Sequence, residues 1–333
     1  MEIEDEIFID DDGEILDIIN YGFPRKIYDR SNYFQDMDNL TFFQRFRLTK
    51  PTVLTVLDQI EHRLEFPTNL NNSITPINQL LSALRFYACG GHQNDIADIM
   101  GMHQSTLSRV VRRVSAAIAE LLPQHIKFPI AEERIRQQSN FFQIARFPKV
   151  LGCVDGTHIK IVSPGGEDSE IFRNRKSYFS INTQVICNSE LKILDLVARW
   201  PGSVHDATIY MNSRIRARSE SGEFHNAVLL GDSGYPLRTY FLTPLANPVT
   251  RGERLYNESH IRTRNTIERT FGVWKRRFPC LAYGLRCQLQ TSLLVIVAPG
   301  ILHNITIDMK EDLPPAPHNI ETSEKLLANA RAF

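Results

Sequence analysis

Residues 150–162 read VLGCVDGTHIKIV, an apolar run that carries one acidic side chain, Asp155, near its middle. Runs of this composition, bounded by turn residues, predict a buried β-strand. A carboxylate is rarely buried in a strand without a partner, because removing its charge from water is costly. Asp155 is therefore a candidate functional residue, although Asp155 followed by Gly156 also fits a plain hairpin turn.

Further strands are expected at residues 179–187, 193–200 and 227–230, separated by turn sequences at 163–166, 188–189 and 201–203. Three consecutive strands joined by short turns predict an antiparallel meander, and a later strand after a helix predicts a mixed sheet. Helices are expected after residue 203, at about 259–278, and at about 291–309 with an interruption at Pro299. The pattern is that of an α/β protein.

Three more acidic residues lie beside these elements. Asp206 stands where a strand gives way to a helix, Asp232 follows the strand that ends near residue 230, and Glu268 lies at the edge of the apolar face of the helix at 259–278. Ordinary alternatives exist: a first-turn helix acid for Asp206, a loop acid for Asp232, and an i,i+4 ion pair with Arg264 for Glu268. The repeated placement at strand ends favours a functional cluster.

A cluster of carboxylates indicates a divalent metal. Like charges repel and raise one another's pKa, and a cation removes that cost. Mg²⁺ and Mn²⁺ prefer oxygen ligands, and two such ions about 3.5–4 Å apart can stabilise the attacking and leaving oxygens of a phosphodiester displacement. Zinc is disfavoured, because no set of His and Cys residues has its ligand spacing.

Residues 39–125 predict a helical region. Helices are expected at about 76–89, 93–100 and 105–121, and Gly101 separates the last two. In the third helix five apolar residues at helical spacing form one face, with basic residues outside it. A short helix, a Gly-containing turn and a basic amphipathic helix form a helix-turn-helix pattern.

The second helix of that motif lies in the major groove of DNA, and its first turn reaches base edges. Gln and Ser side chains can hydrogen-bond bases, and Arg can bind bases or phosphates. The expected DNA-contacting residues of this helix are Gln104, Ser105, Arg109, Arg112 and Arg113. The alternative is an ordinary helical bundle with a solvated basic face.

The formal net charge is zero, from 38 basic and 38 acidic residues, but the charge is unevenly spread. Residues 1–20 carry nine acids and no base, while residues 101–150 carry eight bases and three acids, and residues 251–286 nine bases and three acids. An acidic leader before two basic blocks hints at a nucleic-acid partner. The composition excludes collagenous, disordered and disulfide-scaffold proteins.

Cysteine usage and hydropathy bear on the compartment. The five cysteines form no CxxC pair, which predicts reduced, mostly buried thiols in an intracellular protein. No secretory signal is expected, and the longest apolar run, at 293–298, is far shorter than the ~20 residues needed to span a bilayer. No membrane partner is expected.

Five motifs in order make the chain resemble the PIF/Harbinger transposases over about residues 40–310. The motifs are VDGTH at 154–158, WPGSVHD at 200–206, GDSGYP at 231–236 with LTPL at 242–245, RNTIERTFGVWKRRF at 264–278, and LHN at 302–304. The resemblance implies a ribonuclease-H-like, mixed-sheet DDE nuclease domain behind the helix-turn-helix region. It matches Asp155, Asp232 and Glu268 to the catalytic triad, with 35 residues between the last two.

The same resemblance implies further roles. Asp206 matches an additional metal-site carboxylate, and Arg264 and Lys275 match residues that contact DNA. Similar proteins use Mg²⁺ or Mn²⁺ to cleave DNA strands, with water and then a 3′-hydroxyl as nucleophiles. They also act with a Myb/SANT-like DNA-binding protein that assists nuclear import, which implies a nuclear and cytoplasmic location. Assembly of a homo-oligomer is left open.

The expected organisation is an acidic, weakly ordered leader at 1–38, a helical domain at 39–125, a DDE endonuclease domain at 149–310 and a tail at 311–333. The expected function is metal-dependent DNA endonuclease activity. The alternative is a domesticated adaptor that binds DNA and a partner protein without cleavage, with the carboxylates as a structural metal site. A glycosidase with paired carboxylates is a distant third, because it does not explain the helix-turn-helix pattern.

Overall fold

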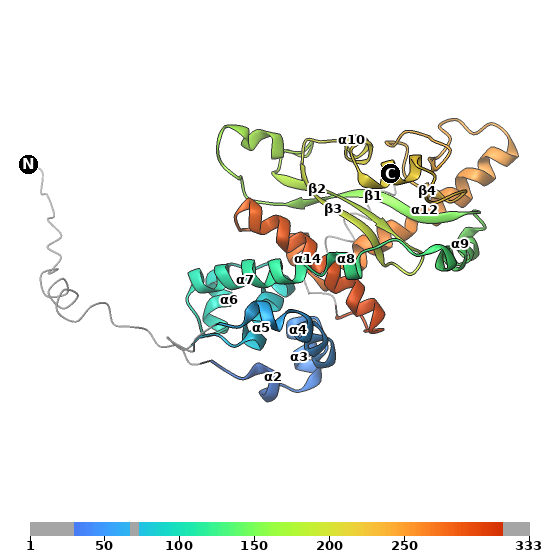
Figure 1. The fold of residues 1–333 in the computed structure, drawn as a ribbon. Helices are drawn as coiled ribbons and strands as arrows, with labels where there is room; N and C mark the ends of the chain where they lie inside the picture. Colours follow the sequence, from blue (N-terminus) through green and yellow to red (C-terminus); the bar gives the residue numbers. More distant parts are fainter. Residues whose placement is uncertain (1–29, 67–72, 316–333) are drawn as a thin grey trace, which may run out of the picture.

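The structure, a computed structural model, describes residues 30–66 and 73–315 (Figure 1). Most of the expected acidic leader and of the expected tail therefore lie outside the described residues. The described chain begins with a group of helices: α2 (Tyr33–Asp36), α3 (Asn39–Phe46), α4 (Lys50–Leu64), α5 (Pro76–Cys89), α6 (Gln93–Ile99), α7 (Gln104–Ala119) and α8 (Leu122–His125).

Helices α5, α6 and α7 begin and end close to the predicted positions. The turn between α6 and α7 contains Gly101 with a φ of 62°, a left-handed conformation that glycine adopts without strain. His103 caps α7, and its ring accepts the Ser105 backbone N–H. The predicted apolar face of α7 is buried, which confirms the helical periodicity.

The sheet has the predicted mixed topology. Its strands are β1 (Val150–Lys160), β2 (Ser180–Cys187), β3 (Ile193–Pro201), β4 (Val228–Leu230) and β5 (Phe241–Leu242). The spatial order is β3-β2-β1-β4-β5, in which β1, β2 and β3 form the expected antiparallel meander. Strand β4 runs parallel to β1, and the short β5, which the sequence did not predict, runs parallel to β4.

Alternate residues of β1 enter two separate cores. Cys153 belongs to the core shared with α12 (Arg251–Arg277) and α14 (Leu289–Asp308). Val154 belongs to the core under α10 (Asp206–Met211) and α11 (Arg214–Glu220). Because successive strand residues point to opposite faces, these cores define the two faces of the sheet. We call them the α12 face and the α10 face.

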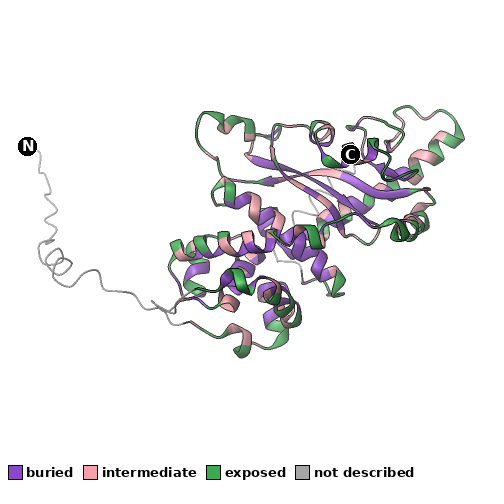
Figure 2. Ribbon diagram, viewed as in Figure 1, coloured by how far each residue is buried: buried purple, intermediate pink, exposed green. Residues whose placement is uncertain are grey.

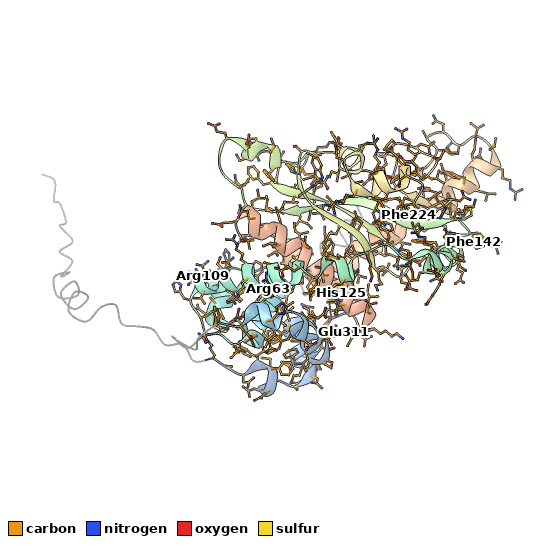
Figure 3. All side chains as sticks on the ribbon, in the orientation of Figure 1. Arg63, Arg109, His125, Phe142, Phe224 and Glu311 are labelled. Carbon is orange, nitrogen blue, oxygen red and sulfur yellow. The ribbon has the colours of Figure 1, made fainter. Side chains whose placement is uncertain are left out.

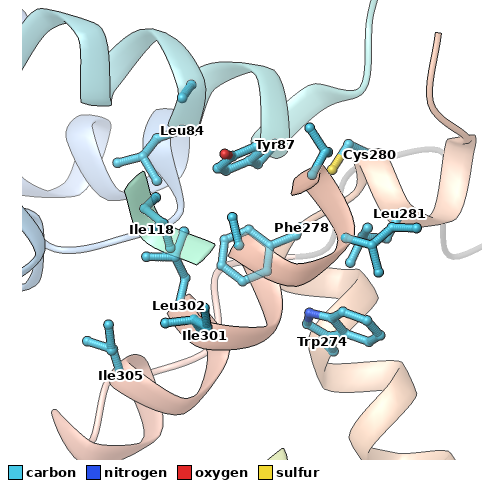
Figure 4. Close-up of a cluster of buried hydrophobic side chains, with 14 of the residues drawn as sticks. Leu84, Tyr87, Ile118, Trp274, Phe278, Cys280, Leu281, Ile301, Leu302 and Ile305 are labelled. Carbon is cyan, nitrogen blue, oxygen red and sulfur yellow. The ribbon is translucent and has the colours of Figure 1, made fainter. Parts of the chain in front are cut away.

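The core of the α12 face continues into the N-terminal helices. Figure 4 shows Tyr87 of α5 beside Phe278, and Ile118 of α7 near Leu302 of α14. The rings of Tyr87 and Phe278 meet edge-on, with centroids 6.4 Å apart. The helical region and the sheet therefore pack as one body, with α14 between them.

Three expectations about helices were wrong. Helix α9 (Ala131–Ala145) was not predicted, and α12 begins at Arg251 rather than near 259, after a capping box formed by Thr250 and Glu253. Helix α14 continues through Pro299 without interruption. Burial of α14 on several sides outweighs the hydrogen bond that Pro299 cannot donate.

Helix α14 is long and apolar enough to cross a membrane by length and composition alone, with a mean hydropathy of 1.4. However, 72% of that window is buried inside the protein, which is typical of a core helix, and Figure 2 shows α14 largely in the colour of buried residues. All five cysteines are free, and three of them are buried, as the sequence predicted.

Two described elements remain. They are η1 (Glu167–Phe172), a 3₁₀ helix after β1, and α13 (Cys280–Tyr283), which joins α12 to α14.

Candidate active site

Parallel pairing of β1 with β4 brings two of the predicted acids together. Cys153 of β1 lies opposite Leu230 of β4. Asp155 lies two residues after Cys153, and Asp232 lies two residues after Leu230. Adjacent strands lie about 4.8 Å apart, so the chain at Asp232 runs beside Asp155 at the same end of the sheet. The backbone N–H of Gly234 donates to Asp232 Oδ1 at 2.9 Å, which fixes the turn after β4.

Helix α12 brings Glu268 to the same place. Arg264, one turn before Glu268, donates from Nη1 to Asp155 Oδ2 at 3.1 Å and from Nη2 to Glu268 Oε1 at 2.9 Å. One guanidinium group therefore bridges the carboxylates of β1 and α12. The Arg264 and Asp155 side chains are only 15% and 19% exposed, so this pairing is well shielded from water.

Burial raises the pKa of Asp155 to about 6, although the Arg264 guanidinium and the Gly156 N–H lower it, and the charges of Asp232 and Asp206 add to the rise. The ionised form of Asp155 is thus costly at neutral pH, as expected of a carboxylate that awaits a cation. Perturbed carboxylates of this kind concentrate at functional sites.

The structure places Asp206 on the other face of the sheet. A Cβ atom added to Gly156 would lie 2.1 Å from Asp206 Oδ1, so Asp206 packs on the α10 face, opposite the Asp155 side chain. Asn182 Nδ2 donates to Asp206 Oδ1 at 2.8 Å. The sequence predicted strand-end placement but could not tell the face. The metal-binding role of Asp206 stays a prediction.

Tyr235 is a site residue that the sequence analysis missed. Burial raises the pKa of its hydroxyl well above the usual range, and the charges of Asp206, Asp155 and Asp232 raise it further. The hydroxyl is buried, and no described residue forms a hydrogen bond with it. The sequence feature that could have identified Tyr235 as a site residue is its position three residues after Asp232, in the motif GDSGYP.

The donor chemistry of this site suits a hard divalent cation. The side chains are carboxylates, whose oxygens such a cation prefers as ligands. The buried Tyr235 hydroxyl and Asn182 Oδ1, which lack partners among the described residues, lie on the α10 face of the sheet. Within the described ranges, no group of three or more His, Cys, Asp or Glu side chains is close enough to hold one metal ion. Arg264 stands between two of the acids and forms an ion pair with each.

Lys275 lies farther along the same face. Its Nζ donates to Thr157 Oγ1 at 2.6 Å, and Thr157 follows Asp155 on the α12 face of β1. Burial lowers the pKa of Lys275 to about 8. The contacts with DNA predicted for Lys275 and Arg264 stay predictions. Arg264 pairs with the carboxylates, and Lys275 contacts Thr157, two residues after Asp155.

The residues predicted on the first turn of α7 have local partners. Gln104 Nε2 donates to Gln93 Oε1 at 2.8 Å, which links α7 to α6. The Ser105 hydroxyl lies 2.8 Å from His103 Nδ1 in the cap of α7. Both positions lie at the surface end of the helix, and their DNA contacts stay predictions.

The three arginines of α7 have different surroundings. Arg109 and Arg112 are exposed, and Figure 3 shows Arg109 at one end of the molecule, far from Phe142 of α9. Arg113 instead donates to the backbone carbonyls of Arg63 and Glu65 at 3.0 and 2.9 Å, so it caps the end of α4. This structural contact makes Arg113 the weakest of the three candidates for DNA binding.

Comparison with known proteins identifies the family of the chain. The DDE superfamily endonuclease family matches residues 154–304. A human protein named "Putative nuclease HARBI1" is 32% identical over 305 residues, covering 90% of this chain and 87% of that protein. The Xenopus laevis protein of the same name is 29% identical over 302 residues, covering 89% and 86%.

A plant relative extends the comparison. "Protein ALP1-like" of Arabidopsis thaliana is 27% identical over 312 residues, covering 87% of this chain and 75% of that protein. No solved structure matches the chain. The matched residues run from within β1, through the turn after β4, to most of α14, and so include all four predicted acids. The chain belongs to the Harbinger-type family of DDE transposase-derived proteins.

Proposed function

We propose that this protein is a divalent-metal-dependent DNA endonuclease in which Asp155, Asp232 and Glu268 hold Mg²⁺ or Mn²⁺. The observation that carries the proposal is the meeting of Asp155 and Glu268 on one guanidinium, beside the turn that carries Asp232. Asp206, which packs on the opposite face of the sheet, is included as a further metal-site carboxylate from the family resemblance alone. When bound, the metal supplies charge stabilisation for the oxygens that attack and leave the phosphorus atom.

Arg264 has a defined part in this proposal. It bridges Asp155 and Glu268, and a cation on these carboxylates would compete with its two hydrogen bonds. The guanidinium of Arg264 would also suit a DNA phosphate, because planar Arg donors bind phosphate oxygens in pairs. The helix-turn-helix role of α6 and α7 in binding DNA is part of the same proposal.

Nicking of supercoiled plasmid tests the function. The full chain is incubated with plasmid and Mg²⁺, Mn²⁺ or EDTA, with and without a Myb/SANT-like partner, beside Asp155→Asn and Glu268→Gln. We expect metal-dependent nicking that falls by roughly a thousandfold in both variants, since the metal contribution is worth several kcal/mol. Glu258→Gln, on an exposed acid of the same helix paired with Arg262, is the matched control and keeps full activity.

The second candidate is an adaptor that binds DNA and a partner protein without cleaving. One observation favours it: Arg264 gives two of the acids, Asp155 and Glu268, a cationic partner within the protein itself. Intact DNA binding with no nicking under any of these conditions would select the adaptor. The Myb/SANT-like partner, the nuclear and cytoplasmic location and a homo-oligomer stay predictions from the family resemblance.

A further inference from the structure

A groove separates α7 from the loops that follow β1 and α13. It has a volume of about 520 Å³, and the two α7 arginines Arg109 and Arg112 line one wall. Arg286, from the segment between α13 and α14, lines the other wall together with Ser163. The groove thus lies between the helical region and the sheet region, away from the carboxylates of β1.

The groove is unusual in its charge. Three arginines line it, and none of its lining residues, all within the described chain, is acidic. Among residues 30–66 and 73–315, no carboxylate forms an ion pair with Arg109, Arg112 or Arg286. Three cationic side chains that converge without an anion indicate a site for an anionic ligand.

The walls of the groove are held in place by packing. Helix α7 packs against α14 through the shared core. Gly90, at the end of α5, approaches α13 so closely that an added Cβ would lie 2.8 Å from Cys280 Cα. Arg286 Nη1 also donates to the ring of His92, at the start of α6. The packing therefore fixes the two walls that carry the three arginines.

The lining favours a nucleic-acid backbone over a free nucleotide. No aromatic side chain lines the groove, so it offers no surface for stacking a base. Its other polar residues include Gln104 and Gln288, which can donate to phosphate oxygens. A second hollow of about 200 Å³ shares Gln104 and Arg286 with the first and lengthens the track along α6. An elongated, basic track with no Phe, Tyr or Trp among its described lining residues suits a polymer of phosphates.

We propose that this groove binds the sugar–phosphate backbone of DNA and that Arg109, Arg112 and Arg286 contact its phosphates. The proposal rests on the proposed function, since it takes DNA as the substrate. It adds that the helical region and the catalytic region both contact the same DNA backbone, at a distance from the carboxylates of the candidate active site. The separation can be judged from Asp155, in the candidate active site, and Ser163, in the groove. A fully extended chain between them would span about 26 Å, at about 3.3 Å per residue.

Fluorescence anisotropy with a labelled duplex of arbitrary sequence, in EDTA and over a range of salt concentrations, tests the groove. Arg112→Gln and Arg286→Gln should each weaken binding by roughly 5–10-fold at 0.1 M salt and lower the salt slope by about 0.9, as expected for one lost phosphate contact. Arg136→Gln, an exposed arginine on α9 at the far end of the sheet, is the matched control and should bind like the wild type (Figure 1).

The outcomes separate the two proposals. If Arg112→Gln and Arg286→Gln bind DNA with the affinity and salt slope of Arg136→Gln, the groove proposal is wrong, whether or not the protein nicks plasmid. If both variants lose affinity but the wild type never nicks, the groove stands and the nuclease proposal fails. Calorimetry with inorganic phosphate and ATP tests whether the groove binds a free nucleotide instead. Tight ATP binding that Arg286→Gln abolishes, with DNA affinity unchanged, would identify a nucleotide site and contradict the groove proposal.

Discussion

Helices α7 and α12 carry similar basic sequences, but their charges have different surroundings. On α12, Arg264 binds two carboxylates, and Arg277 is 3% exposed and paired with the equally buried Glu311. On α7, Arg109 and Arg112 border an open groove without an acidic partner in the described chain. The comparison teaches that a basic run in the sequence does not by itself indicate a nucleic-acid surface. Basic residues that pair with carboxylates inside the protein have to be excluded first.

The largest expected effect tests whether Arg277 belongs to the fold. Arg277 Nη1 donates to Glu311 Oε2 at 3.0 Å and to the Arg47 carbonyl at 2.9 Å. Arg277→Met should lower the free energy of unfolding by about 3–5 kcal/mol, because it leaves the Glu311 charge buried and unpaired. Urea unfolding measures this, and Arg277→Met combined with Glu311→Met should recover part of the loss. A loss below about 1 kcal/mol in the single variant would contradict the structural role.

The next effect concerns Lys275 and pH. Its pKa falls from 10.5 to about 8 on folding, because burial disfavours the charged form. The unfolded chain therefore binds more protons between pH 8 and 10.5, and the cost of the buried charge is fully present below pH 8 and fades as the pH rises through that window. Lys275→Met should be more stable than the wild type by about 1–2 kcal/mol at pH 7, with the gap closing by pH 10.5.

The difference between the two unfolding free energies, measured against pH, isolates this group from the others that titrate. A gap that is constant from pH 7 to 10.5 would mean that Lys275 is not desolvated. Because Lys275 donates to Thr157 beside Asp155, its variant should be compared in EDTA, where no metal alters the site.

The smallest effect separates two neighbours on α7. Arg113→Gln should cost about 1 kcal/mol of stability, because it removes donors to the carbonyls at the end of α4, and should leave DNA affinity nearly unchanged. Arg112→Gln should do the reverse, with stability within about 0.5 kcal/mol of the wild type. Thermal unfolding and DNA titration of both variants check the pair. Equal loss of DNA affinity in both would show that the whole basic face binds DNA.

Much of the fold was predictable because its periodicities are strong. The period-two pattern and the turn residues predicted strands β1 to β4 and the mixed sheet. The apolar stripe of α7 predicted the bounds of that helix to within about two residues. Helix α9 was missed because only Phe141 is buried in it, so its amphipathic signal is weak. The first turns of α12 were missed for the same reason, since they are mostly exposed.

The candidate site was predictable in part. Strand-end placement identified Asp155 and Asp232, and the helix face identified Glu268, but the sequence could not show that Arg264 joins two of these acids. Nor could it show that Asp206 packs on Gly156 from the opposite face, because both placements have the same strand-end signature. The groove with Arg286 depends on packing between distant segments, which no local pattern records.

Manganese binding tests the central claim most directly. In the absence of DNA, the free Mn²⁺ signal in electron paramagnetic resonance falls when the ion binds protein. We expect the wild type and Glu258→Gln to bind Mn²⁺ equally, and Asp155→Asn and Glu268→Gln to lose that binding while keeping a wild-type thermal unfolding profile. Equal Mn²⁺ binding by all four proteins, or none by the wild type, would contradict a metal site built from the carboxylates of β1 and α12.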